Sequence, residues 1–200
     1  MKIFILTLVS SFILSCSSAQ KTVDTKNNPE NYASTITAQE LKEMLYVYAS
    51  DEMEGRMTGT KGQRMAAEYI RDFYIKEGIK AAPGTDNYYQ HIPESYFEGK
   101  KNPQATENVI AFIEGAEKPE EVIVLSAHLD HVGVDDNGNV FNGADDDGSG
   151  TVAIMQIAQA FQQAVKDGNP PKRSILFLHV TAEEIGLYGS RYYTENPLFP

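Results

Sequence analysis

The sequence predicts an α/β fold of three layers, α/β/α, with helices on both faces of a mixed, mostly parallel sheet. Short apolar runs rich in β-branched residues alternate with helical patterns in the second half of the chain, which is typical of strands joined by crossover helices. Residues 173–180, RSILFLHV, are apolar on both faces, as expected for a central strand covered by two helical layers. The 200 residues are 42% hydrophobic and 22% charged, so the chain can form a globular core.

The first 16 residues have the pattern of an export signal. Lys2 precedes an apolar run over residues 3–14, which is too short to span a bilayer. Cys16, the only cysteine, ends this run and resembles the lipidated cysteine of a bacterial lipoprotein. An ordinary secretory signal cut near residues 17–19 is the alternative. We therefore expect an exported protein without internal disulfides. It would be lipid-anchored at the outer membrane through Cys16 alone, or else periplasmic or secreted.

Residues 17–36 are polar and lack periodicity, which predicts a flexible tether before a domain at residues 37–200. Thr37 opens the domain with a capping box, TAQE, in front of a helical pattern. A Gly-rich turn over residues 51–63 follows. A second helix is expected at about residues 62–76, with Gly78 as its C-cap.

After the second helix, the apolar residues no longer follow helical spacing and instead form short runs typical of strands. Two apolar runs, residues 108–115 and 121–127, read as strands joined by a polar turn that contains Pro119. An amphipathic helix is predicted at residues 151–165, before the strand at residues 173–180. The segment IGLYGSRYYTEN after that strand predicts another short helix.

Acidic and imidazole residues follow these predicted elements in a common arrangement. They form three clusters: His128 with Asp130 after one strand, Asp145 to Asp147 before the helix, and Glu183 with Glu184 after the next strand. In such sheets ligands bind beyond the carboxyl ends of the strands, where a returning helix also begins. We therefore expect all three clusters on one rim.

A cation would resolve the repulsion among so many carboxylates. Imidazole together with carboxylate suits zinc, whereas carboxylates alone also accept calcium or magnesium, so His128 favours zinc. Residues i and i+2 of an extended segment point the same way, so Asp130 could accept the free N–H of His128. By the same geometry His131 should point away from His128. Taken singly, each cluster could be a strand-end polar group, a turn or a helix cap.

The motifs SAHLDH, NGADDDGSG and RSILFLHVTAEEIGLYGSRYY resemble the secreted di-zinc aminopeptidase family. This family includes bacterial leucyl aminopeptidases, glutamate carboxypeptidase and related glutaminyl cyclases. SDEMEGRMTGTKGQRMAAEYI resembles its N-terminal segment, so the resemblance runs from about residue 38 to residue 200. It implies a phosphorylase/hydrolase-like fold and a zinc exopeptidase, most simply an aminopeptidase that hydrolyses peptides with a metal-activated water.

The resemblance also implies roles for individual residues. His128 and Glu184 match zinc ligands, and Asp146 matches the carboxylate that bridges two zinc ions. The peptide bond after that aspartate is cis in the family. Asp130 matches the residue that orients the histidine, and Glu183 matches the general base. His179, within an apolar strand, is expected to be a buried core group.

The family uses five zinc-binding side chains, and this sequence offers His128, Asp146 and Glu184. We expect the remaining ligands beyond residue 200, and weak zinc binding by these 200 residues alone. The net charge of −11 argues against nucleic acid as a partner but names no substrate; the resemblance implies peptide substrates. A glutaminyl cyclase-like acyltransferase with one zinc ion, or a non-catalytic peptide-binding lipoprotein of the same fold, are the alternatives. The sequence predicts no oligomeric state.

Overall fold

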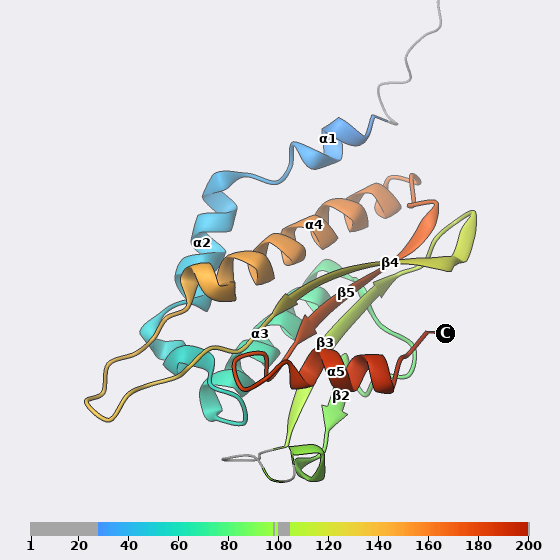
Figure 1. Cartoon of the computed structure of the whole chain (residues 1–200). Helices are drawn as coiled ribbons and strands as arrows, with labels where there is room; N and C mark the ends of the chain where they lie inside the picture. Colours follow the sequence, from blue (N-terminus) through green and yellow to red (C-terminus); the bar gives the residue numbers. More distant parts are fainter. Residues whose placement is uncertain (1–27, 98, 100–104, 200) are drawn as a thin grey trace, which may run out of the picture.

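The computed structural model describes residues 28–97, 99 and 105–199 (Figure 1). The predicted signal peptide with Cys16, and the first part of the predicted tether, lie outside these residues. The helices are α1 (Pro29–Ala33), α2 (Ala38–Tyr48), η2 (Asp51–Arg56), α3 (Lys61–Glu77), η3 (Glu94–Phe97), η4 (Ala144–Gly148), α4 (Ser149–Lys166) and α5 (Tyr188–Glu195). The strands are β1 (Lys80–Ala81), β2 (Tyr89–Ile92), β3 (Thr106–Ile113), β4 (Lys118–His128) and β5 (Arg173–Val180). In this part of the chain, none of the helices combines the length and apolar character that crossing a membrane requires.

The predicted helix boundaries are confirmed where the sequence carries capping signals. Thr37 accepts the N–H of Glu40 at 3.2 Å, which is the N-cap bond of the predicted capping box, and donates its hydroxyl to the Glu40 carboxylate at 2.8 Å. Gly78 ends α3 with a φ of 75°. Residues 29–33, which the sequence assigned to a flexible tether, instead form α1, and Asn169 Nδ2 donates to Tyr32 Oη at 2.8 Å.

The sheet is mixed, in the order β1-β3-β5-β4, with β2 paired to β3. Only the β4–β5 pair is parallel among the described strands, whereas β1, β2 and β5 all run antiparallel to β3. The expectation of a mostly parallel sheet is therefore wrong for this part of the chain. The physical reason lies in the link from β3 to β4, residues 114–117, which is too short for a crossover connection. The link can still span the distance from β3 to β4, which is two strand spacings or about 10 Å, if the two strands run in opposite directions.

The sequence predicted that Pro119 lies in a turn, but it lies within β4. The ladder to β5 shifts its register between Lys118 and Val122. A proline, which has no N–H to donate, is tolerated at such an irregularity.

Alternate residues of β5 face two helical layers, which confirms the predicted three-layer arrangement. On one face Ile175 and Phe177 pack with α2, α3 and α4, and on the other Leu176 and Leu178 pack with Tyr193 of α5. Figure 1 shows α5 on the opposite side of the sheet from α4. All but the first residue of β5 are buried, so the central strand is apolar on both faces as its sequence indicates.

His179 of β5 is a fully buried core residue, as predicted. Its Nε2 lies 2.6 Å from Tyr74 Oη, and its Nδ1 has no hydrogen-bond partner among the described residues. Burial lowers the pKa of His179 to about 3. The folded protein therefore holds this imidazole neutral, with Nε2 hydrogen-bonded to the tyrosine hydroxyl.

This pair predicts a loss of stability in mild acid. The unfolded chain takes up a proton on this histidine below a pKa of about 6.5, whereas the folded chain does so only near 3. The unfolded state therefore binds more protons between these values, and the free energy of unfolding falls as the pH falls, by at most about 1.4 kcal/mol per pH unit. In urea unfolding at pH 7, 6 and 5, His179→Gln should lose less stability than the unchanged chain. His91→Gln, at an exposed histidine, is the control. Parallel pH profiles for His179→Gln and the unchanged chain would contradict the assignment.

Candidate metal centre

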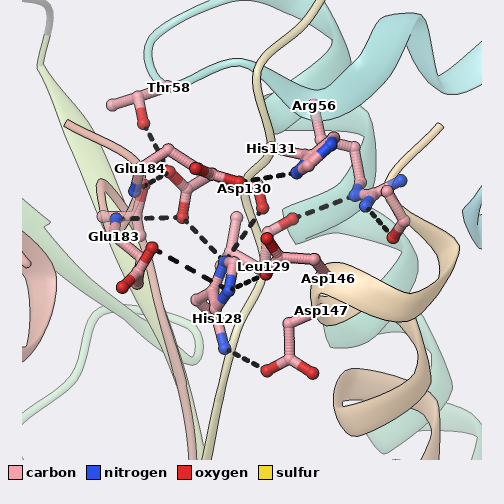
Figure 2. Close-up of polar contacts among 12 residues, drawn as sticks. Arg56, Thr58, His128, Leu129, Asp130, His131, Asp146, Asp147, Glu183 and Glu184 are labelled. Carbon is pink, nitrogen blue, oxygen red and sulfur yellow. Dashed lines mark hydrogen bonds and ion pairs between the residues drawn. The ribbon is translucent and has the colours of Figure 1, made fainter. Parts of the chain in front are cut away.

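The parallel pairing of β4 and β5 brings two of the predicted clusters to one edge of the sheet. His128 pairs with Val180 at the ends of the two strands, and the N–H of Leu129 donates to the Val180 carbonyl at 2.8 Å. Residues 129–131 and 181–184 therefore leave the sheet side by side. Figure 2 shows His128, Asp130, Glu183 and Glu184 gathered at this edge.

The start of α4 contributes the third cluster and is tied to the backbone of His128. The N–H of His128 donates to Asp147 Oδ2 at 3.1 Å, and its carbonyl accepts the Thr151 hydroxyl at 3.0 Å. Asp147 Oδ1 also accepts the N–H of Gly150 at 3.0 Å, and a Cβ at Gly150 would lie 2.2 Å from this oxygen. Asp147 thus fastens the helix to the strand end, and only glycine fits at position 150.

Asp130 is fully buried and holds the two glutamates by their backbone. Its Oδ1 accepts the N–H of Glu183 at 3.1 Å, and its Oδ2 accepts the Thr58 hydroxyl at 2.9 Å and the N–H of Glu184 at 3.4 Å. The carboxylate lies 3.7 Å from His128 Nδ1, while the carbonyl of Asp130 accepts from that nitrogen at 3.1 Å. Asp130 therefore orients His128 mainly through its backbone, and the Glu183–Glu184 segment through its side chain.

The contact with a carbonyl fixes the tautomer of His128. Because the Asp130 carbonyl can only accept, Nδ1 carries a proton and Nε2 faces Asp146 Oδ1 at 2.9 Å. Burial lowers the pKa of His128, but the nearby Asp130 and Asp147 carboxylates outweigh this effect and raise it to about 9. Without a cation the carboxylates keep a proton on Nε2, so a metal ion that binds this nitrogen must displace that proton.

His128, Asp146 and Glu184 converge on one region. His128 Nε2 lies 2.9 Å from Asp146 Oδ1. Donor atoms of His128, Glu183 and Glu184 lie within 4.8 Å of one another, and so do donor atoms of His131, Asp146 and Glu184. Asp146 is the open side of the cluster, with 65% of its side chain exposed, whereas Glu184 is 19% exposed. The peptide bond between Asp146 and Asp147 is cis, as the resemblance implies.

His131 also joins this cluster, which contradicts the expectation that it points away. Its Nδ1 lies 2.6 Å from Glu184 Oε1. The i and i+2 argument fails because β4 ends at His128. Beyond that point the chain turns so that the N–H of His131 donates to the Arg56 carbonyl at 3.2 Å. No pattern in the sequence predicts this turn.

The donor set fits a zinc ion. Imidazole nitrogen and carboxylate oxygens are ligands that zinc accepts, and a catalytic site commonly has three protein ligands and an open position. The Glu184 carboxylate belongs to one group with Glu183 and to another with Asp146, so a divalent cation would relieve the repulsion between neighbouring carboxylates.

Comparison with known sequences agrees with this geometry. Residues 108–199 match the sequence profile of peptidase family M28. The matched segment, which is less than half of the chain, contains the residues of all three clusters, because they lie between His128 and Glu184.

The similar curated proteins are longer than this chain. A probable glutamate carboxypeptidase, LAMP1 of Arabidopsis thaliana, is 40% identical over 89 residues, which are 44% of this chain and 12% of the relative. A probable leucine aminopeptidase 2 of Aspergillus oryzae is 35% identical over 101 residues, which are 50% of this chain and 18% of the relative. The chain therefore spans less than a third of the length of either relative.

Solved structures show the same fold. LapB of Legionella pneumophila has a TM-score of 0.59 at 24% identity, over 84% of this chain and 41% of that chain. A Zn-dependent exopeptidase of Parabacteroides distasonis has a TM-score of 0.60 at 20% identity, over 79% of this chain and 56% of that one.

The sequence did not single out Arg56. This residue precedes the matched segment in the sequence, and in the structure it packs beside the candidate metal ligands. The side chain is fully buried, and its guanidinium donates to the carbonyls of Tyr48, Leu129, Asn142 and Gly143 at 2.7–3.2 Å. Its neighbour Gly55 has a φ of 62°, and a Cβ there would lie 2.2 Å from the Gly133 carbonyl oxygen. One guanidinium therefore joins the loop after β4 to the loop before Asp146. Only its place in the segment EGRMTG, which resembles a family motif, hinted at a role.

We expect Arg56→Met to destabilise the protein by about 3 kcal/mol or more. The substitution leaves buried carbonyls without a donor, and each such loss costs about 1–3 kcal/mol. Arg56→Lys should lose less, because a lysine can still reach some of these oxygens. Urea unfolding measures both variants. The control is Arg71→Met, at a guanidinium that is 22% exposed and pairs with the more exposed carboxylate of Asp72. Equal losses for Arg56→Met and Arg71→Met would contradict the anchoring role.

Proposed function

We propose that this protein is a zinc-dependent exopeptidase, and specifically an aminopeptidase that removes N-terminal residues from peptides. The observation that carries the proposal is the convergence of His128, Asp146 and Glu184, with the Glu183 carboxylate beside them. The match of residues 108–199 to an M28 peptidase profile supports it, as do a leucine aminopeptidase and a Zn-dependent exopeptidase among the similar proteins.

His128, Asp146 and Glu184 would hold the zinc. Asp130 and Asp147 keep the His128 imidazole and backbone in place for this role, as outer partners of metal ligands commonly do. Zinc, when bound, supplies the positive charge that acidifies a water molecule and polarises a carbonyl group. The resemblance implies two ions, and the exposed Asp146 carboxylate would be one of the groups that hold them.

Glu183 is suited to move the proton. Its N–H is fixed on the Asp130 carboxylate, while its own carboxylate is 34% exposed and lies 4.0 Å from His128 Nε2. A carboxylate held by its backbone, with its oxygens open to the site, can take a proton from the attacking water. It can then pass that proton to the amine that leaves when the peptide bond breaks.

The aminopeptidase activity is proposed from the similarity to a probable leucine aminopeptidase. Zinc bound by Asp146 and Glu184 would offset much of the negative charge of these carboxylates. The charge of the metal-free cluster therefore does not decide between an aminopeptidase and a carboxypeptidase.

Glu183→Gln tests the proton-transfer role. The amide keeps the size of the side chain but cannot accept the proton, so hydrolysis of aminoacyl-nitroanilides should fall by about 100-fold or more. Zinc affinity should change little in this variant, whereas Glu184→Gln should weaken zinc binding. Equal rates for the unchanged chain and Glu183→Gln would favour a peptide-binding protein without catalysis.

We further propose that the protein acts in the cell envelope, anchored by a lipid on Cys16. The apolar run before the only cysteine supports this location. Cys16→Ser should abolish incorporation of radiolabelled palmitate in a bacterial host and release the protein from the membrane fraction. Unchanged fractionation of Cys16→Ser would instead favour an ordinary secretory signal.

A further inference from the structure

A second histidine, His131, contacts the proposed zinc ligand Glu184. The function proposed above gives this histidine no role. His131 Nδ1 and Glu184 Oε1 are 2.6 Å apart, and the two side chains are 14% and 19% exposed. The contact joins the loop after β4 to the loop after β5, as Figure 2 shows. It is shorter than the 2.9 Å contact between His128 and Asp146.

The imidazole of His131 is fixed from two sides. Its backbone N–H donates to the Arg56 carbonyl at 3.2 Å. Gly143, with a φ of 54°, packs against the ring so closely that a Cβ there would lie 2.5 Å from His131 Cγ. Arg56 makes both restraints: its carbonyl accepts the N–H of His131, and its guanidinium donates to the carbonyl of Gly143. The backbone hydrogen bond and the packing against Gly143 therefore fix the position of the His131 ring.

The distance between the two side chains decides what the contact is. The 2.6 Å between His131 Nδ1 and Glu184 Oε1 is the length of a strong, charge-assisted hydrogen bond to a carboxylate. Because the carboxylate can only accept, His131 Nδ1 carries the proton and donates it.

We propose that His131 is a positioning residue that holds the Glu184 carboxylate for the metal and is not itself a ligand. Its Nδ1–H engages Oε1, which leaves the second carboxylate oxygen for zinc. Asp130 holds the backbone N–H of Glu184 at 3.4 Å, so the glutamate is fixed at both ends. Glu183 is held by its backbone N–H, and its carboxylate makes a looser contact, at 4.0 Å, with His128 Nε2, which fits the proton transfer proposed for it. This inference rests on the proposed function, since it takes Glu184 as a zinc ligand.

Zinc affinity of two His131 variants tests the inference. In competition with a chromophoric chelator, His131→Leu should bind zinc about 10–100-fold more weakly than the unchanged chain. His131→Asn should recover part of the loss, because its amide nitrogen can donate from nearly the position of Nδ1. His91→Gln, at an exposed histidine whose Nε2 lies 3.5 Å from Asp86, is the matched control and should bind normally. Urea unfolding of each variant checks that the fold is retained.

X-ray absorption at the zinc edge separates positioning from ligation. The number of imidazole ligands should be the same in His131→Leu, saturated with zinc, as in the unchanged chain. Loss of one imidazole would overturn the inference, because His131 would then be a ligand. Equal affinity of the unchanged chain and His131→Leu would overturn it as well. Absence of zinc binding by the unchanged chain would overturn the proposed function together with this inference.

Discussion

The parallel pairing of β4 with β5 is the constraint on which the candidate centre depends. Because His128 lies opposite Val180, the loops that follow both strands leave the sheet together. The pairing requires a crossover, and α4 supplies it, beginning at the same edge where Asp146 and Asp147 lie. A single topological feature therefore brings together residues from three distant parts of the sequence.

Bringing carboxylates together has an electrostatic cost that the surrounding structure offsets. Asp130 is fully buried but accepts a hydroxyl and two backbone N–H groups, which is how a buried carboxylate is tolerated. Asp147 is satisfied by backbone donors as well. Arg56 adds a buried positive charge beneath the cluster, with its donors directed to carbonyls and not to the carboxylates. The carboxylates of Asp146 and Glu183 are the more exposed members of the cluster and can meet a cation or a proton.

Two adjacent glutamates acquire different environments from this arrangement. The Glu184 carboxylate is held by His131, and the Glu183 carboxylate is more exposed. Both backbone N–H groups are bound by the same aspartate, Asp130. A fixed carboxylate suits a metal ligand and a freer one suits proton transfer, so the difference arises from their neighbours and not from their chemistry.

The sequence by itself determined the capped helices, the central strand and the residues of the three clusters. These features are local, since capping, periodicity and strand-end position are carried by neighbouring residues. The tertiary structure decided the antiparallel direction of β3, the helix α1 in the predicted tether, and the positions of Arg56 and His131. Each of these depends on partners far away in the chain: Arg56 binds carbonyls at residues 129, 142 and 143, and His131 meets Glu184. The direction of the His131 side chain could not follow from i and i+2 alternation, because a long-range hydrogen bond, and not a strand ladder, sets the backbone there.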